Sequence, residues 1–567
     1  MSHMEMPFNI HFDNATLALL SVCALLAAVT YKLAAPPPLV HPFILGRQAV
    51  PRPNRLPDQS PVYTNASNGG ARPPYRPDKD TKSLHDILKR SHSVLEGTSA
   101  LDLGAIARIA PGQKLVQIVQ HLRAGLVGKL GGKAAGGRVI VAIQDASDAL
   151  LVTLALACSP YKPFVLAPGS VLEDAAPADL VAVVRSPNWA PWSAQVPDIV
   201  IGDDSGDVAR ELIEDGKLLF EDGKDGAAPA GEASDVVVAM YSDDKVLEYT
   251  NQNLTASLVS WAALFPTSPT PTKPTIRDSV LSFHHPSTPY GFGLALYLVS
   301  QSAGLAFPTL PQAGETAAEQ LAEIFKAPSR PGVTLMFAPV DQLAKPLYNL
   351  ILSEMLGDSA FIVRASRDGK LRLLREGVVT KQTFWDSLLY KGLRKDTNLT
   401  RLRALFLAAA PAFDQSRLET LRGALGCPVA QTLSHAALLA PLCAGHMFDL
   451  QRLPPPGLKR LRGDEKSHVG PPALGMEIKI AGKEEDISAG RIKGEILVRT
   501  PVLPNPKTLS SDLLVTDMSR PAHPPYPGTD ESSAQIEGPQ WFKTGVLAEI
   551  SPEGTVWIDE SASRALV

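Results

Sequence analysis

Short apolar runs alternate with helix-like segments along most of the chain, and this alternation constrains the fold more than any other feature. The runs have the length and the Val and Ile content of buried strands, and the segments between them show helical spacing of apolar residues. The expected strands are residues 138–143, 163–167, 197–201, 236–240, 279–283 and 333–337. The expected helices are residues 148–158, 254–264, 317–325 and 346–356. Such alternation builds helices onto mostly parallel sheets, so the sequence predicts an α/β fold with layered sheets.

The pattern changes near residue 470. Beyond it, apolar and polar residues alternate in short segments bounded by turns, which indicates a small β-rich subdomain. The segments are residues 476–482, 494–501 and 554–560. Residues 503–540 are dense in Pro, Ser and Asp and are expected to form an exposed loop. We therefore place an α/β domain at 81–470 and a β-rich subdomain at 471–567.

The amino-terminal region contains an uncharged, leucine-rich run at residues 15–31. About 17–25 such residues are needed to span a bilayer as a helix, so we expect a transmembrane anchor at 15–33 after a tail at 1–14. A cleaved signal peptide and a buried core helix are the alternatives. The first cations follow the run, which predicts a cytosolic body, with the endoplasmic reticulum as the first expectation among several organelles. Residues 34–80 are rich in proline and are expected to form an extended connector.

Charge and cysteine content exclude some classes of function. The chain has 54 Lys and Arg against 58 Asp and Glu, for a net charge of −4, which argues against a nucleic-acid-binding protein. Its four cysteines are scattered and the sequence contains neither C-x-x-C nor H-E-x-x-H. The sequence therefore predicts no disulfide scaffold and no metal site.

Seven segments, taken in order, resemble motifs of the adenylate-forming superfamily, in particular of the long-chain acyl-CoA synthetases. They match the segment after the family's membrane helix, T-H-x-N-L, P-L-x-H-x-x-G, the strand before G-G-A-P, Q-G-Y-G-x-T-E-T, G-E-I-x-V-R and G-W-F-x-T-G-D. The corresponding residues are 41–48, 249–254, 281–291, 405–411, 431–438, 494–499 and 541–546. The resemblance covers the chain from about residue 36 to its end. It implies the family's two-step chemistry, in which a fatty carboxylate attacks the α-phosphate of ATP and coenzyme A then displaces AMP.

The same resemblance shows where the chain departs from an active enzyme. The family's phosphate-binding loop should follow the strand at 237–241, but the segment there lacks glycine and carries Asp243 and Asp244, which would repel a polyphosphate. The family's Mg²⁺-binding glutamate falls on Ala437 and its ribose-binding aspartate on Val546. Neither methyl-bearing side chain can serve in those roles. The chain also ends near the family's hinge, so the mobile carboxyl-terminal domain is expected to be missing.

Some positions that match the family keep residues suited to ligand binding. Tyr241, Lys245, Thr544 and Gly545 are the candidates for residual nucleotide binding. His284 and His285 are the candidates for substrate binding near the acyl tunnel. No catalytic residue is assigned.

These observations lead to three hypotheses. The first is a membrane-anchored, catalytically degenerate pseudoenzyme that needs no cofactor and binds membrane lipid, a fatty acid, an acyl-CoA or a protein partner. The second is an active long-chain fatty acid–CoA ligase with a divergent site for ATP, Mg²⁺ and coenzyme A. The third is a purely structural interaction protein. An open apolar cavity near Tyr241, Ala437 and Val546 favours lipid binding, whereas a packed core favours scaffolding.

Overall fold

The protein is described here by a computed structural model. The described residues are 13–33, 40, 42–53, 56–69, 71, 73–90, 115–131, 136–170, 177–189, 196–201, 207–221, 231–242, 245–267, 272–308, 332–356, 360–408, 412–451, 467–505, 508–509, 511–516 and 540–559. The predicted helix at 317–325 and most of the predicted tail lie outside them.

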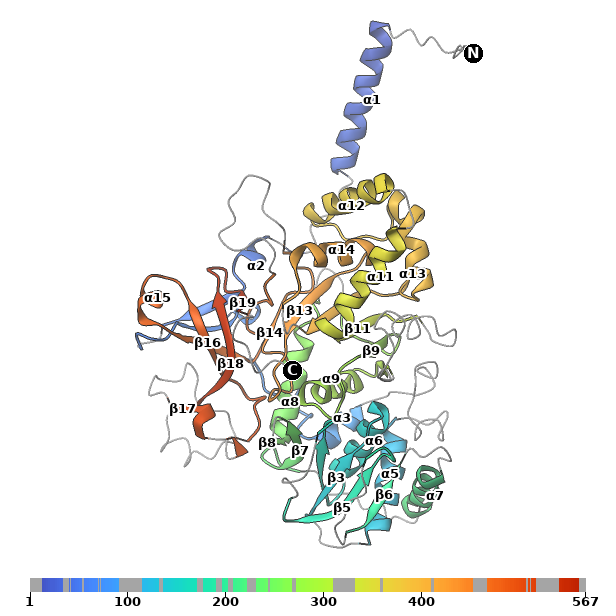
Figure 1. Ribbon diagram of the computed structural model, residues 1–567, viewed down its shortest axis with the longest axis vertical. Coiled ribbons are helices and arrows are strands. Elements are labelled where there is room, and N and C mark those ends of the chain that lie inside the picture. The colour runs from blue at the N-terminus through green and yellow to red at the C-terminus, as the bar shows by residue number, and fades with distance from the viewer. Residues whose placement is uncertain are drawn as a thin grey trace.

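The amino-terminal helix α1 (Asn14–Leu33) stands away from the rest of the molecule (Figure 1). Its leucines, among them Leu19 and Leu25, are exposed. Nevertheless, no helix among the described residues combines the length and the apolarity that a membrane crossing requires, so the predicted transmembrane anchor is not supported. A physical reason is length, because an uncharged run from 15 to 31 makes a helix of only about 26 Å, against a hydrocarbon core of about 30 Å.

A first sheet forms the lower part of the molecule in Figure 1 and has the strand order β6-β5-β3-β4-β7-β8. Its strands are parallel except for the β7–β8 hairpin. The strands are β3 (Arg138–Ala142), β4 (Lys162–Leu166), β5 (Leu180–Arg185), β6 (Asp198–Val200), β7 (Val236–Ser242) and β8 (Lys245–Thr250). The accompanying helices are α5 (Leu115–Leu130), α6 (Ala146–Ala157) and α7 (Asp207–Glu221), whereas α3 (Leu84–Arg90) packs against helices of the second sheet. The apolar runs predicted as strands at 138–143, 163–167, 197–201 and 236–240 are confirmed.

A second sheet has the order β10-β9-β11-β12-β13-β14 and is parallel except at β14. Its strands are β9 (Ser279–Ser282), β10 (Gly304–Ala306), β11 (Leu335–Pro339), β12 (Ala404–Ala408), β13 (Val429–Leu433) and β14 (Cys443–Ala444). Its helices are α8 (Asn251–Ala262), α9 (Pro289–Ser300), α11 (Lys345–Leu356) and α14 (Gln415–Leu425). Phe337 and Phe406 stack in the core, with Phe265 packed edge-on against both. Two parallel sheets with helices confirm the predicted α/β class.

A third sheet is antiparallel and has the order β1-β2-β15-β16-β18-β17, with β19 beside β18. Its elements are β1 (Ala49–Arg52), β2 (Val62–Asn65), β15 (Glu477–Gly482), α15 (Glu484–Ser488), β16 (Lys493–Arg499), η6 (Ser511–Leu513), β17 (Leu514–Thr516), β18 (Gln540–Ile550) and β19 (Val556–Ile558). The structure therefore differs from the expected connector at 34–80, because β1 and β2 form one end of this sheet. Proline is tolerated in β1 since that strand lies at the sheet edge. The short α2 (Pro42–Gly46) and η1 (Ala66–Asn68) flank these strands.

Helices with a strongly charged outer surface form a further layer near the end from which α1 projects (Figure 1). They are α12 (Ala360–Arg375), the π-helical turn η4 (Asp386–Tyr390) and α13 (Lys391–Asp396), and a second π-helical turn, η3 (Val340–Ala344), leads into α11. Neither α12 nor α13 was predicted from the sequence.

Candidate functional site

The three sheets meet around Ala437, in the segment that follows β13. The Tyr249 hydroxyl, on β8 of the first sheet, donates a hydrogen bond to the Ala437 carbonyl at 3.0 Å. The backbone N–H of Ala437 donates to Nδ1 of His435 at 3.1 Å. Nε2 of His435 therefore carries the proton, and it donates to the Thr544 carbonyl on β18 of the third sheet at 3.1 Å. Ala437 is thus built into the junction of all three sheets.

The turn at Thr544, Gly545 and Val546 is also held by hydrogen bonds within the protein. The Thr544 hydroxyl donates to the Ile496 carbonyl at 2.8 Å and accepts from the Val546 N–H at 3.2 Å. Gly545 has a φ of +68°, and its N–H donates to the Glu495 carboxylate at 3.0 Å. Thr544 and Val546 are buried. The Thr544 hydroxyl therefore both donates and accepts inside the fold.

The segment 249–254, which resembles T-H-x-N-L, begins α8. The Thr250 side chain accepts from the Asn253 N–H, and the Asn253 side chain accepts from the Thr250 N–H, which forms a capping box. The Asn253 amide also donates to the Pro501 carbonyl at 2.7 Å. This motif has a structural role in the chain, because it starts a helix and ties it to the β-rich subdomain.

The β7–β8 hairpin carries the other two candidates for residual nucleotide binding. Tyr241 is buried and its ring lies 6.4 Å from that of Phe164, centroid to centroid, within the first sheet. Lys245 begins β8, is exposed, and pairs with Ser242 across the hairpin. The predicted acidic residues Asp243 and Asp244 lie outside the described residues.

His284 and His285 lie in the loop between β9 and α9. Nδ1 of His285 accepts from the Ser287 N–H, so its Nε2 carries the proton and donates to the Gln144 carbonyl at 3.1 Å, which ties this loop to the first sheet. The His284 ring packs edge-on against Tyr290 at 4.7 Å between centroids. Its Nε2 atom is buried and has no hydrogen-bond partner within the described part of the chain. A buried polar atom of this kind suits a ligand or a water.

Burial lowers the pKa of His284 to about 3 and that of His285 to about 4. Both pKa values lie below that of an unfolded histidine, so the unfolded chain binds more protons than the folded protein as the pH falls below about 6.5. We therefore expect the free energy of unfolding to decrease from about pH 6.5 to about pH 4, by about 1.4 kcal/mol per pH unit for each ring that stays neutral. Urea unfolding at neutral and at mildly acidic pH measures this loss. A double variant, His284→Gln with His285→Gln, should show a shallower pH dependence, and an unchanged slope would contradict the assignment.

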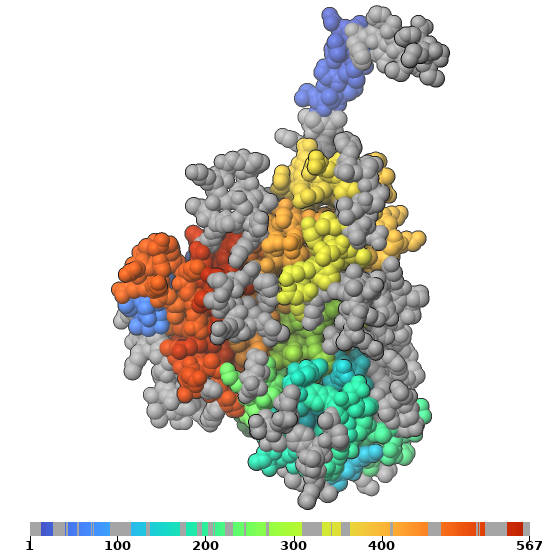
Figure 2. Space-filling model, viewed as in Figure 1, coloured from blue at the N-terminus to red at the C-terminus, as the bar shows by residue number. Residues whose placement is uncertain are grey.

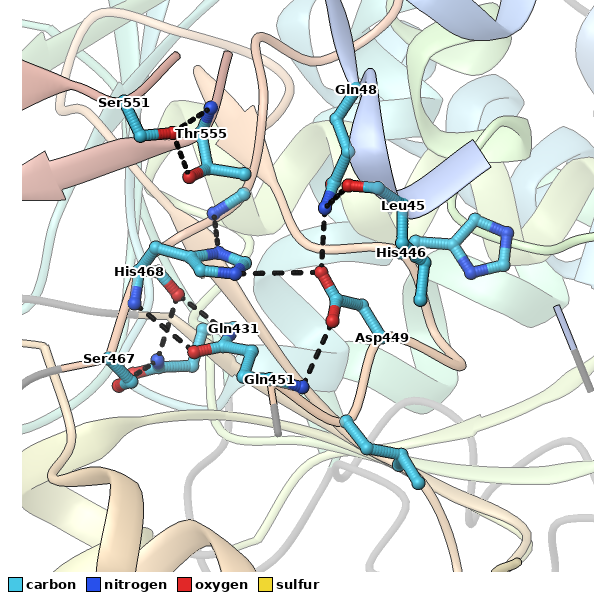
Figure 3. A network of polar contacts seen from close by, with 12 residues as sticks. Leu45, Gln48, Gln431, His446, Asp449, Gln451, Ser467, His468, Ser551 and Thr555 are labelled. Carbon is cyan, nitrogen blue, oxygen red and sulfur yellow. Dashed lines mark hydrogen bonds and ion pairs between the residues drawn. The ribbon is translucent and has the colours of Figure 1, made fainter. Parts of the chain in front are cut away.

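A buried polar network that the sequence did not indicate centres on Asp449 (Figure 3). The Asp449 carboxylate accepts from the Gln48 side chain at 2.8 Å and from the Gln451 N–H at 2.9 Å. His468 lies 3.5 Å from the same carboxylate through Nε2, and its Nδ1 accepts from the Gly470 N–H. No sequence motif could reveal it, because Gln48 and Asp449 are 401 positions apart. The network joins the start of the chain to the loop before the β-rich subdomain.

A cavity of about 500 Å³ lies away from the three-sheet junction. Both cations and carboxylates line it, including Arg76, Lys82, Asp86 and Glu232. Among the residues that the structure describes, no group of three His, Cys, Asp or Glu side chains is placed to hold a metal ion.

Comparison with known proteins gives a clear result for the fold. No protein-family model matches the sequence, and no curated protein matches it. Among solved structures, a long-chain-fatty-acid-CoA ligase (FadD1) from Archaeoglobus fulgidus matches with a TM-score of 0.55 and 15% identity, over 86% of each chain. VinN, solved in complex with L-aspartate, matches with a TM-score of 0.51 and 18% identity, over 85% of this chain and 100% of VinN. At these identities the likeness establishes the fold.

Proposed function

We propose that this chain, which has the adenylate-forming fold of the acyl-CoA synthetases, is a non-catalytic member of that structural group. In this proposal it binds an acyl ligand without activating it. The observation that carries the proposal is the packing at Ala437 and Val546. Both positions carry aliphatic side chains without a polar atom and are buried at the junction of the three sheets.

The chemistry of adenylation explains why this packing matters. Attack of a carboxylate on the α-phosphate of ATP releases pyrophosphate, and the developing charge must be neutralised by a metal ion, cations and N–H donors. Ala437 supplies no oxygen for a metal, and Val546 supplies no acceptor for ribose hydroxyls. The Thr544 hydroxyl already has two partners within the protein. Loss of a single stabilising donor typically costs ~10²–10³ in rate, so these combined losses support an inactive site.

Tyr241, Ala437 and Val546 are buried, and packing at that place is what was expected of a scaffold rather than of a lipid-binding cavity. The proposal of acyl binding therefore rests on a different part of the molecule. His284 places a buried ring nitrogen without a protein partner, within the described residues, beside Tyr290. The resemblance places this loop near the family's acyl tunnel. The neutral imidazole could donate to, or accept from, a fatty carboxyl group, which would satisfy the buried atom.

The proposal predicts that the full-length protein, given Mg·ATP and a long-chain fatty acid, exchanges no labelled pyrophosphate into ATP above the protein-free rate. A known ligase in the same assay is the positive control. Exchange that scales with protein concentration and disappears in a Thr544→Val variant would establish an active ligase instead.

Acyl binding is measured separately, by displacement of a fluorescent fatty acid from the same protein. We expect His284→Phe to weaken binding about tenfold, since it removes one hydrogen bond from a buried ligand. His121→Phe is the matched control, because His121 also has a buried ring nitrogen without a partner in the described part of the chain but lies on α5 of the first sheet. Equal affinities for the wild type and His284→Phe would remove the support for an acyl site here.

A further inference from the structure

The helical segment from residue 360 to 401 has a charge opposite to that of the whole protein. It contains ten Lys and Arg residues and four Asp and Glu residues, a net charge of +6 in a chain whose net charge is −4. We call it the cationic lobe. Its charge is concentrated on two helices, α12 and the continuous helix formed by η4 and α13.

The outer face of α12 carries a row of arginines. Arg364, Arg367, Arg372 and Arg375 are all exposed and follow one another at spacings of three to five residues, which keeps them on one side of a helix. The opposite side of α12 faces the protein through Ser366, Lys370 and Leu374, which are buried. Two carboxylates, Asp368 and Glu376, lie among the arginines, so the exposed face keeps an excess of positive charge.

The neighbouring helix adds large apolar side chains to the same lobe. Phe384 is 72% exposed and Leu388, one turn further on, is 52% exposed. Lys391 and Lys395 continue the exposed side of this helix toward its end. An exposed Phe and Leu followed by exposed lysines is the arrangement of a helix that rests on a membrane surface, with its apolar side chains among the lipids and its cations at the headgroups.

Buried contacts hold the two helices as an antiparallel pair. Asp386 forms ion pairs with Lys370 of α12 and with Arg394 of α13, and the Ser366 and Tyr390 hydroxyls lie 3.3 Å apart. Gly369 leaves room for the Trp385 ring, because a Cβ there would lie 2.5 Å from the indole nitrogen. These contacts therefore fix the helices that carry the exposed arginines and the exposed Phe384 relative to each other.

The position of the lobe agrees with a lipid surface. Figures 1 and 2 show α12 at the end of the molecule from which α1 projects. The α1 leucines, such as Leu17 and Leu20, are about half exposed and lack a protein surface to cover them among the described residues. The exposed leucines of α1 and the cationic lobe thus lie at one end of the protein.

We propose that the cationic lobe docks on the surface of an anionic lipid bilayer. A bilayer of this kind offers phosphate and carboxylate headgroups to the arginines and a hydrocarbon boundary to Phe384 and Leu388. An acidic protein or a nucleic acid would match the charge, but neither offers a continuous apolar layer to the two exposed apolar side chains. The inference concerns a surface and is independent of the proposed lack of catalysis.

The test is flotation of the full-length protein with vesicles of phosphatidylcholine alone or of phosphatidylcholine mixed with phosphatidylserine. We expect stronger binding to the anionic vesicles, and this preference should shrink as salt is raised. A combined variant should bind anionic vesicles at least ~10-fold more weakly, since each cation near such a surface raises the binding affinity about fivefold. The variant carries Arg364→Gln, Arg367→Gln, Arg372→Gln and Arg375→Gln. Phe384→Ser with Leu388→Ser should weaken binding to both kinds of vesicle.

Matched controls use exposed residues elsewhere. The control for charge changes four exposed cations together to Gln, namely Lys89, Lys162, Lys217 and Arg277. The control for apolar surface is Leu218→Ser with Ile276→Ser. Apolar contacts do not distinguish the two vesicle types, so the difference between them isolates the charge of the cationic lobe. Equal binding to the two vesicle types, or an unchanged preference in the four-arginine variant, would overturn the proposal. Binding of a labelled DNA duplex without any preference for anionic vesicles would overturn it too and assign the lobe to nucleic acid.

Discussion

Replacing Asp386 by asparagine will lower the free energy of unfolding by about 3–5 kcal/mol, because it leaves two buried cations without their counter-charge. Asp386, Lys370 and Arg394 are each about 95% or more buried, and the Asp386 carboxylate is ion-paired with both cations. Burial acts to raise the pKa of Asp386, but hydrogen bonds from Lys370 and Thr383 hold this pKa below its ordinary value, so the carboxyl group is ionised.

Denaturant unfolding measures this prediction. Asp396→Asn is the matched control, because Asp396 lies on the same helix but is exposed, and its loss should change stability by less than about 0.5 kcal/mol. A variant that removes the charges together, Asp386→Leu with Lys370→Met, should be less destabilised than Asp386→Asn alone, since fewer unpaired charges remain. Equal stability of Asp386→Asn and Asp396→Asn would show that the buried ion pairs do not hold the lobe.

Replacing Arg422 by methionine is expected to cost about 3–5 kcal/mol of unfolding free energy, for a different reason. Arg422 is 1% exposed, and its guanidinium donates to the Val429 carbonyl at 2.8 Å, to the Leu450 carbonyl at 2.7 Å and to the Asp449 carbonyl at 3.4 Å. Burial lowers the pKa of Arg422 to about 10, so it stays charged at neutral pH. Methionine fills a similar volume but leaves the carbonyl groups without a donor.

Two comparisons separate the hydrogen bonds of Arg422 from the loss of any arginine. Arg417→Met removes a more exposed arginine from the same helix and should cost about 1 kcal/mol or less. Arg422→Lys keeps the charge but loses the planar fork, so its stability should lie between those of the wild type and Arg422→Met. The account of Arg422 fails if Arg422→Met unfolds at the same denaturant concentration as Arg417→Met.

The parts of the fold that the sequence predicts are those with local signals. Residues 138–143 and 236–240 are apolar and short, and they form β3 and β7 because a strand buried on both faces must be apolar throughout. The strands β1 and β2 were not predicted, because their surroundings are rich in proline and β2 pairs with β15, which lies about 400 positions away. Pairing over such a distance leaves no periodic pattern within one window of sequence.

The helices of the cationic lobe were not predicted because they are rich in charged residues. In α12 the buried face includes Lys370, which is ion-paired with a residue of another helix. Because lysine is usually exposed, the sequence alone predicts that this position lies on the surface. A pattern of apolar residues alone cannot identify that face.

The candidate site was only partly predictable. The resemblance to the acyl-CoA synthetases placed Ala437, Thr544 and Val546 in one region. In the structure, the His435 side chain links the Ala437 backbone to the Thr544 backbone by hydrogen bonds. The contact of Tyr249 with the Ala437 carbonyl had no sequence signal, because the two residues are 188 positions apart. The unpaired nitrogen of His284 could be recognised only once its neighbours were placed.

Equilibrium binding of Mg·ATP to the full-length protein, followed by titration calorimetry, tests the central claim most directly. Because Ala437 and Val546 offer no oxygen to a metal ion or to ribose hydroxyls, we expect no saturable heat at nucleotide concentrations up to about 1 mM, the range of a −4 kcal/mol interaction. A cooperative denaturant unfolding transition of the same preparation shows that the protein is folded. Saturable Mg·ATP binding in the micromolar range that is lost in a Lys245→Ala variant would contradict the account and indicate a working nucleotide site.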